Sequence, residues 1–282
     1  MNVSSILKVC MSKIKKIRDF DRAAKDYKKN AVMQLNIADE LIDQLSVIKI
    51  KPNKILDIGS ANGILNNKLT KLFPAAKIVN LDISIEMLKE SKKEDSFIKS
   101  LFGKNNILRI NGDMDQMPFS DESFDLIITS SSIQWSDDVK KLFNAISNIL
   151  NTGGLFIFST FMDGTLNELD GLSDELLINK FLNIHDYAFC LSTNSLIDPV
   201  LTTDTYQLKY KNPKEALLDL KKLGVTKSNS LKKGLRGKGF YEKLINHLKL
   251  SLKEDFYFLT YEVCFGHAWK KDDQLSKPIN FI

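Results

Sequence analysis

The sequence predicts an α/β fold built around a mostly parallel, doubly wound sheet. Short apolar runs alternate with helical patterns along residues 52–160, which is the order that parallel strands and their helical crossovers require. An acidic residue stands at or just beyond the end of three successive runs, at Asp57, Asp82 and Asp113. After residue 161 the alternation stops, which predicts a mainly helical lid inserted after the fifth strand.

The core strands are expected at the apolar runs, over residues 54–58, 77–81, 107–110, 124–129 and 155–160. Helices are expected where apolar side chains recur at helical spacing, over residues 64–73, from Ser84 onward, and over 137–150. Ser84 is a residue type that caps helices, and Gly153 and Gly154 favour the end of the last of these helices.

The chain is expected to divide into four segments. An N-terminal helical segment (1–45) is expected to close over a ligand that the core (46–162) binds. A mainly helical lid with an intervening strand (163–253) is expected to cover that ligand and to carry the region that binds a second reactant. Residues 254–282 include a strongly β-prone run at 255–269, which predicts the final strand of the core sheet and a tail.

Composition excludes several classes of protein. Of the 282 residues, 43% are hydrophobic and 27% are charged, a globular balance that excludes a disordered chain. No apolar run approaches the roughly 18 residues of a membrane helix. Cys10, Cys190 and Cys264 are far apart and form no metal-binding pair, which suggests a reducing compartment. We therefore expect a cytoplasmic protein with no membrane segment and no metal site.

A ligand is expected at the ends of the strands, because open parallel sheets bind ligands beyond their carboxyl edge. Gly59 and Ala61 follow the first strand, where small residues let a ligand approach the backbone. Asp82 can accept hydrogen bonds from two ribose hydroxyls, and Asp113 can accept one from the exocyclic amine of a base. Met114 can pack on that base. These residues favour a nucleoside site.

A nicotinamide dinucleotide is the first alternative for this site, but the glycine pattern disfavours it. In the GxGxxG fingerprint of those sites the second glycine is replaced here by Ala61, and Asp57 precedes the first glycine by two positions. An acid in that loop would repel a pyrophosphate and attract an amine. Adenosine combined with a charged amine describes S-adenosylmethionine.

Residues 54–160 resemble the class I, or Rossmann-like, methyltransferases, which use S-adenosylmethionine and release S-adenosylhomocysteine. The resemblance implies a seven-stranded sheet in which the LDIGSANG segment contacts the methionyl part, Asp82 holds the ribose, and Asp113-Met114 borders adenine. The residues that the resemblance assigns to the cofactor are Tyr27, Asp57, Gly59, Ser60, Ala61, Gly63, Asp82, Ile83, Met87, Asp113, Met114 and Ser130.

A narrower resemblance covers nearly the whole chain after residue 18. The segments DFDRAAKDY, IQW, TFMDGTLNEL, LKKLG and LTY occur in the same order as in the malonyl-[acyl-carrier protein] O-methyltransferases of biotin synthesis. This resemblance implies methyl transfer to the free carboxylate of a malonyl thioester on acyl carrier protein. Two alternatives stay open: a class I methyltransferase with another small-molecule acceptor, such as a quinone ring, and a non-catalytic cofactor-binding assembly factor.

The implied reaction needs no general base, because a carboxylate is already ionised and nucleophilic at pH 7. Catalysis is then expected to consist of alignment and the exclusion of water. Arg22 is the candidate partner of the acceptor carboxylate, with a salt bridge to Asp19 or Asp26 as the alternative. Gln134 and Trp135 are expected to wall the acceptor pocket, although a buried core position is the alternative for Trp135.

Basic side chains concentrate in residues 201–250, where twelve lysines and arginines accompany four acids, in a chain whose net charge is +5. Acyl carrier protein is strongly acidic, so we hypothesise that this region docks it. A lysine-rich solvated surface is the alternative. Nucleic acid is an unlikely partner, because the region has no interleaved aromatics and no known recognition motif.

Overall fold

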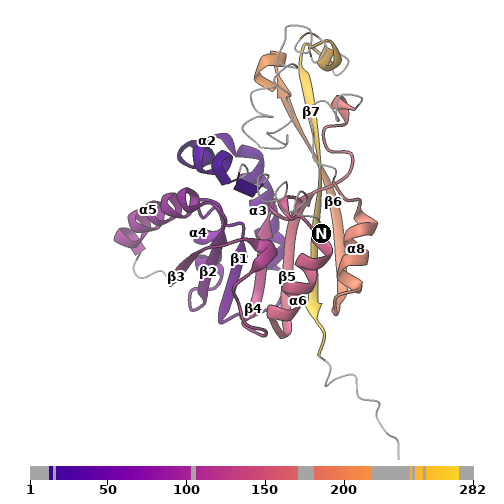
Figure 1. Ribbon diagram of the computed structural model, residues 1–282. Coiled ribbons are helices and arrows are strands. Elements are labelled where there is room, and N and C mark those ends of the chain that lie inside the picture. The colour runs from indigo at the N-terminus through magenta and orange to yellow at the C-terminus, as the bar shows by residue number, and fades with distance from the viewer. Residues whose placement is uncertain are drawn as a thin grey trace, which may run out of the picture.

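The structure is a computed structural model that describes residues 13–14, 17–102, 106–170, 181–216, 242, 245–249 and 252–272. Within these residues, seven strands form one sheet in the order β3-β2-β1-β4-β5-β7-β6 (Figure 1). The strands are β1 (Lys54–Ile58), β2 (Lys77–Asp82), β3 (Ile107–Asn111), β4 (Phe124–Ser130), β5 (Leu150–Phe161), β6 (Leu196–Tyr210) and β7 (Tyr257–Lys270).

The directions of the strands show at which edge of the sheet a ligand is expected to bind. Strands β1 to β5 pair in parallel, and β7 runs antiparallel to both β5 and β6. The chain moves outward from β1 to β2 and β3, and then returns to the other side of β1 with β4 and β5. The carboxyl ends of β1 and β4 therefore flank the point at which the strand order reverses, where doubly wound sheets bind ligands.

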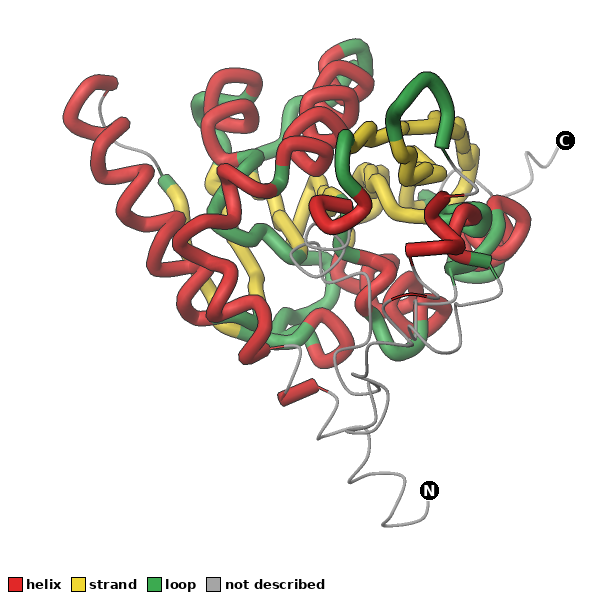
Figure 2. The backbone as a smooth tube through the Cα atoms, turned by 90° about the horizontal axis from the view of Figure 1, so that it is seen from above, coloured by secondary structure: helices red, strands yellow, loops and turns green. Residues whose placement is uncertain are grey.

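Helices cover both faces of the sheet, as the view from above shows (Figure 2). Helices α3 and α4 pack on one face, where Leu41 and Leu69 join Ile55 in one apolar cluster. Helices α6 and α8 pack on the other face, where Phe143 and Leu191 belong to a second cluster. The helices are α2 (Tyr27–Asn30), α3 (Val32–Ser46), α4 (Asn66–Leu72), α5 (Ile85–Phe102), α6 (Val139–Ile149) and α8 (Ile184–Ser192), with short 3-10 turns η1 (Ala24–Asp26), η2 (Met114–Gln116), η3 (Ile133–Trp135) and η4 (Asn167–Leu169).

Local sequence explains where these elements begin. Helix α6 starts after Asp138, whose carboxylate accepts the Lys141 N–H at 3.1 Å and caps the first turn. Helix α8 starts with a capping box, in which Asn183 and Asp186 each accept the other's backbone N–H. Strands β1 and β4 consist largely of buried residues, which is why their sequences are continuous apolar runs.

The predicted alternation of strands and helices is confirmed, with one shifted boundary. Helix α6 ends at Ile149 and β5 begins at Leu150, five residues before the expected strand. The register between β4 and β5 shifts after the Phe124–Leu150 pair, and Gly153 adopts a φ of +72° in the bulged segment. The glycines that were expected to end the helix therefore lie inside an irregular strand.

The lid prediction is testable only in part. Strand β6 is its intervening strand and forms the sheet edge, where most of its side chains are exposed. Farther along the expected lid, residues 213–216 are helical, and residues 217–241 lie outside the described part of the chain. No helix in the described part of the chain is both long enough and apolar enough to cross a membrane.

Candidate active site

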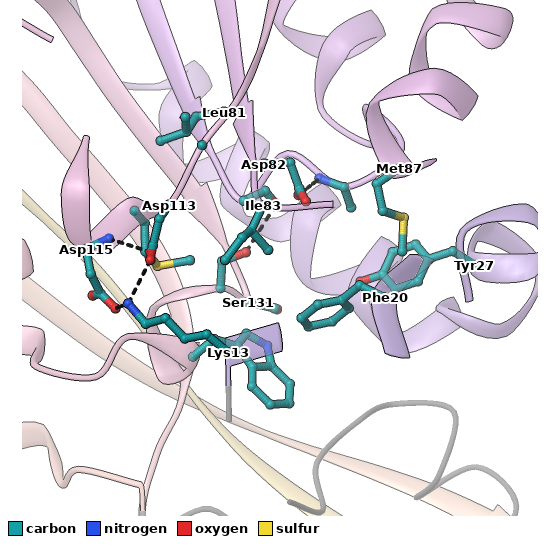
Figure 3. Close-up of a pocket in the computed structure, with 16 residues that line it drawn as sticks. Lys13, Phe20, Tyr27, Leu81, Asp82, Ile83, Met87, Asp113, Asp115 and Ser131 are labelled. Atoms are coloured by element: carbon teal, nitrogen blue, oxygen red, sulfur yellow. Dashed lines mark hydrogen bonds and ion pairs between the residues drawn. The ribbon is translucent and has the colours of Figure 1, made fainter. Parts of the chain in front are cut away.

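A pocket lies at the carboxyl ends of β1, β2, β3 and β4, with the N-terminal segment along its rim (Figure 3). The empty space inside it, including its open mouth, is about 730 Å³. Most of the predicted site residues line it, namely Tyr27, Gly59, Ala61, Asp82, Ile83, Met87, Asp113, Met114 and Trp135. The structure therefore brings most of the predicted site residues together around one pocket, and their contacts with a cofactor stay predictions.

A smaller adjoining cavity of about 300 Å³ contains the predicted residues Asp57, Ser60 and Ser130. It is also lined by Gln34 of α3. Among the described residues, Gln34 Oε1, Asp57 Oδ2 and Ser60 Oγ are buried and have no hydrogen-bond partner. Buried acceptors without partners are costly, so a donor is expected to occupy this cavity. A charged amine satisfies such a group of acceptors.

Gln34 was missed in the sequence analysis although the chain carries a signal for it. It shares a helical stripe with Ile37, Ala38 and Leu41, all of which are buried in the apolar core. A polar residue on such a stripe is an exception that needs a partner. The stripe identifies the residue, but only the fold shows that α3 brings it beside Asp57.

The aspartates at the strand ends have unusual electrostatics. Burial, with a contribution from the charge of Asp82, raises the pKa of Asp57 to about 8. Burial also raises the pKa of Asp82 to about 6, although two backbone N–H groups oppose this effect. Asp82 Oδ2 accepts from Ala61 N at 2.8 Å, and Oδ1 accepts from Ser84 N at 2.8 Å. Asp82 thus ties the loop after β1 to the start of α5.

The loop after β1 turns through left-handed backbone conformations. Gly59 and Gly63 have φ values of +67° and +80°, and Ala61 has a φ of +46°. Alanine at such a position is strained, at a cost of roughly 1–2 kcal/mol. The strain is offset in part by the hydrogen bond from Ala61 N to Asp82. Gly63 lines neither cavity among the described lining residues, so its contact with the cofactor stays a prediction.

Lys13 lines the pocket beside Asp113, where the adenine base of a nucleoside is expected. The sequence analysis did not predict this residue. Its Nζ lies 2.7 Å from Asp113 Oδ2, 3.0 Å from Asp115 Oδ2 and 3.1 Å from Asp137 Oδ2. These hydrogen bonds raise the pKa of Lys13 even though its burial opposes them. No sequence pattern marks this lysine among its basic neighbours, because its partners are brought to it by the fold.

The N-terminal segment also contacts the ends of other strands. The rings of Phe20 and Trp135 meet edge to face, with centroids 5.4 Å apart. Ser84 Oγ donates to Asp21 Oδ1 at 2.5 Å, which joins this segment to the start of α5. Residues before α3 therefore pack against the segments that follow β2 and β4, and their closing over a bound cofactor stays a prediction.

Two predicted acceptor residues lie elsewhere in the structure. The Arg22 side chain is 78% exposed and its Nη1 lies 3.4 Å from Asp19, which agrees with the salt-bridge alternative. The Gln134 amide is directed into the protein, where it contacts the Ser131 carbonyl and Thr160. Neither side chain is among the described residues that line the pocket. Their roles toward an acceptor stay predictions.

Binding of a cationic amine at pH 7 is expected to release close to one proton. Asp57 is mostly protonated at that pH, because its pKa is about 8, and a cation beside it lowers the pKa below 7. Calorimetry of S-adenosylmethionine binding in two buffers of different ionisation enthalpy measures this proton. The release should disappear at pH 9 and in Asp57→Asn. Undiminished release in that variant would show that another group supplies the proton.

The chain resembles known methyltransferases in sequence. Residues 56–158 match a family described as a methyltransferase domain. A malonyl-[acyl-carrier protein] O-methyltransferase from Gallionella capsiferriformans is 31% identical, over 92% of this chain and 91% of its own length. The protein of the same name from Nitrosospira multiformis is 32% identical, over 91% of this chain and 89% of its own.

Solved structures share the fold at lower identity. The YcgJ protein of Bacillus subtilis superposes with a TM-score of 0.60 at 16% identity, covering 84% of this chain and 99% of that one. A phosphoethanolamine N-methyltransferase of Haemonchus contortus, solved with S-adenosyl-L-methionine, gives 0.55 at 18% identity, covering 84% of this chain and 53% of that one. These structures confirm the predicted class I fold. Because its sequence relatives match along nine-tenths of their length, the chain belongs to the malonyl-[acyl-carrier protein] O-methyltransferase family.

Proposed function

We propose that this protein transfers a methyl group from S-adenosylmethionine to the free carboxylate of malonyl-acyl carrier protein, forming a methyl ester for biotin synthesis. The acceptor is taken from the names of the relatives. The observation that carries the proposal is the order of acceptor groups along the sheet edge. The unpartnered Asp57 and Ser60 lie at the end of β1 and just beyond it, Asp82 ends β2, and Asp113 with Met114 follows β3.

The described residues fit each part of the cofactor. Asp57 and Gln34 can accept hydrogen bonds from the methionyl amine. Each oxygen of Asp82 accepts one backbone N–H and keeps a lone pair for a ribose hydroxyl. Met114 offers a thioether to the face of adenine. Asp113 is the poorest fit, because Lys13 already occupies its Oδ2, so the two donors have to share this carboxylate.

The chain's part in the reaction is alignment rather than proton transfer. When bound, S-adenosylmethionine supplies an electrophilic methyl group on a sulfonium. The acceptor carboxylate carries no proton to remove, so a base beside it is unnecessary. Phe20, Tyr27 and Trp135 form apolar walls that exclude water and restrict the orientation of the acceptor.

The proposal is tested by incubating the protein with S-adenosylmethionine and either malonyl- or acetyl-acyl carrier protein. Mass spectrometry of the carrier should show the gain of one methyl group on the malonyl form only, because the acetyl form lacks the free carboxylate. Transfer to both carriers would place the acceptor elsewhere. Cofactor binding without transfer to either would favour another acceptor or a non-catalytic role.

The carrier protein is further proposed to dock on the basic region 201–250. Its residues Lys232, Lys233 and Arg236 lie outside the described part of the chain. Reversing these three charges is expected to raise the KM for malonyl-acyl carrier protein, less so at high salt, and to spare a small malonyl thioester. Reversal of the exposed Lys49, Lys77 and Lys141 changes the net charge by the same amount and is the matched control. Equal effects on both substrates would contradict docking.

A further inference from the structure

Ser131 is a pocket residue that carries a buried hydroxyl. It follows β4 and lines the main pocket (Figure 3), which Trp135 also lines. Its Oγ is buried and has no hydrogen-bond partner among the described residues. Its backbone is left-handed, with a φ of +51°, which is unfavourable for serine. Strain and an unsatisfied buried hydroxyl at one pocket residue point to a bound ligand.

The backbone of Ser131 is held on both sides. Its N–H donates to the Ser159 carbonyl at 2.9 Å and to Ser159 Oγ at 3.2 Å, both on β5. Its carbonyl accepts the Gln134 side-chain amide at 2.7 Å. The unfavourable conformation is therefore fixed by β5 and η3 rather than by contacts of the Ser131 side chain.

The Gln134 side chain is held in turn by a buried chain of hydrogen bonds. Gln134 Oε1 accepts from Thr160 Oγ1 at 3.1 Å, and Thr160 Oγ1 lies 3.3 Å from the Tyr187 hydroxyl. Because the Thr160 proton goes to Gln134, Tyr187 on α8 is the donor to Thr160 in this chain, and the Phe161 carbonyl at 3.2 Å is a second acceptor for the same Tyr187 proton. Tyr187 is almost completely buried, with 1% of its surface exposed. Helix α8 thus reaches the pocket through Thr160 and Gln134.

We propose that the Ser131 hydroxyl donates a hydrogen bond to the acceptor carboxylate, and that Tyr187 is a positioning residue that holds Ser131 through Thr160 and Gln134. This inference rests on the proposed function. The other charged side chains on this pocket are Asp82, Asp113 and Asp115, which repel a carboxylate, and Lys13. The charge of Lys13 is already neutralised by its ion pairs with Asp113, Asp115 and Asp137. The parts of the cofactor have partners at β1, β2 and β3. A neutral hydroxyl donor beyond β4 supplies what the acceptor needs.

The first test removes the Ser131 hydroxyl with two substitutions that differ in how well they tolerate a positive φ. Ser131→Ala keeps a Cβ, whereas Ser131→Gly accepts the positive φ without strain. Both variants are expected to raise the KM for malonyl-acyl carrier protein about tenfold, the usual effect of losing one hydrogen bond to a charged group. The Kd for S-adenosylmethionine should stay within about twofold by the same reasoning. Ser123→Ala, at the opposite end of β4, is the control and should change neither constant.

Two outcomes overturn the assignment of Ser131. An unchanged KM in both variants would show that the hydroxyl does not touch the acceptor. A weakened cofactor Kd with an unchanged KM would place the hydroxyl on the cofactor instead. A wild-type protein that transfers no methyl group would overturn the proposed function as well, so the two failures are distinguishable.

The second test measures coupling between α8 and the pocket. Tyr187→Phe keeps the buried ring and should raise the same KM by about threefold, a smaller effect because the contact is indirect. In the Ser131→Ala background the same substitution should have no further effect on KM. Ser192→Ala removes an exposed hydroxyl of α8 and is the control. Equal increases in KM on adding Tyr187→Phe to the wild type and to Ser131→Ala would contradict a positioning role.

Discussion

Replacement of Gly59 by alanine is expected to destroy cofactor binding and to destabilise the protein. A Cβ on this residue would lie 2.3 Å from Ser132 Oγ and 2.5 Å from Ser132 Cβ, and φ is already +67°. Ser132 cannot easily yield, because its Oγ donates toward the Gly59 and Ser130 carbonyls. We expect a loss of about 3 kcal/mol in the free energy of unfolding. The loop after β1 should move, and the cofactor Kd should rise at least about 100-fold.

Gly153→Ala separates the steric clash from the backbone strain. Gly153 has a similar φ of +72°, but a Cβ there would meet nothing within 4 Å. Only the strain of a left-handed alanine remains, roughly 1–2 kcal/mol, and cofactor affinity should be unchanged. Denaturant unfolding and calorimetry measure both quantities. Similar losses of unfolding free energy and of cofactor affinity in the two variants would mean that the clash of the added Cβ with Ser132 is unimportant.

Asp82→Asn is expected to raise the cofactor Kd by about 100-fold, because several hydrogen bonds depend on one carboxylate. An amide keeps one acceptor oxygen, so either Ala61 N or Ser84 N loses its partner. The ribose loses an ionised acceptor at the same time.

Stability should respond less than affinity in this variant. A buried carboxyl whose pKa is raised to about 6 favours the folded state most when it is protonated. Its contribution to folding therefore falls as the pH rises from about 4 to 6. At pH 7 the asparagine removes this unfavourable ionisation, which offsets part of the lost hydrogen bonding.

Asp125→Asn is the matched control for Asp82→Asn. Asp125 lies at the opposite end of the sheet, where its Oδ2 accepts from Asn53 N at 2.8 Å and from Lys54 N at 3.0 Å. It supports two backbone N–H groups as Asp82 does, but it is far from the pocket. Its replacement should lower the free energy of unfolding and leave the cofactor Kd unchanged. Comparable losses of affinity in both variants would assign the effect of Asp82 to folding alone.

The sequence was sufficient to predict the strands of the core and most of the residues that line the main pocket. Parallel strands buried on both faces are written as continuous apolar runs, so β1 and β4 were placed within a residue or two. The residues that follow such strands must meet at one edge. The strand pattern alone was therefore enough to predict that Asp57, Asp82 and Asp113 lie near one edge of the sheet.

Other features depend on contacts between residues far apart in the chain. Lys13 meets Asp113 across 100 positions, and neither neighbourhood contains a pattern for the other. The left-handed backbone of Ser131 is imposed by Ser159 and Gln134, and serine itself does not favour it. Arg22 had the right chemistry for a carboxylate, but its side chain lies in solvent beside Asp19. Residue type predicts what a group can do, whereas the fold decides what it faces.

The position of the transferred methyl group is the most direct test of the proposed reaction. A single turnover with methyl-labelled S-adenosylmethionine and malonyl-acyl carrier protein, followed by fragmentation of the product, locates the label. One labelled methyl is expected on the malonyl carboxylate, as an ester that mild base removes, and much less label within the same time with Asp82→Asn at a cofactor concentration near the wild-type Kd. A label on the carrier polypeptide, or no label while S-adenosylmethionine still binds, would contradict the proposed reaction.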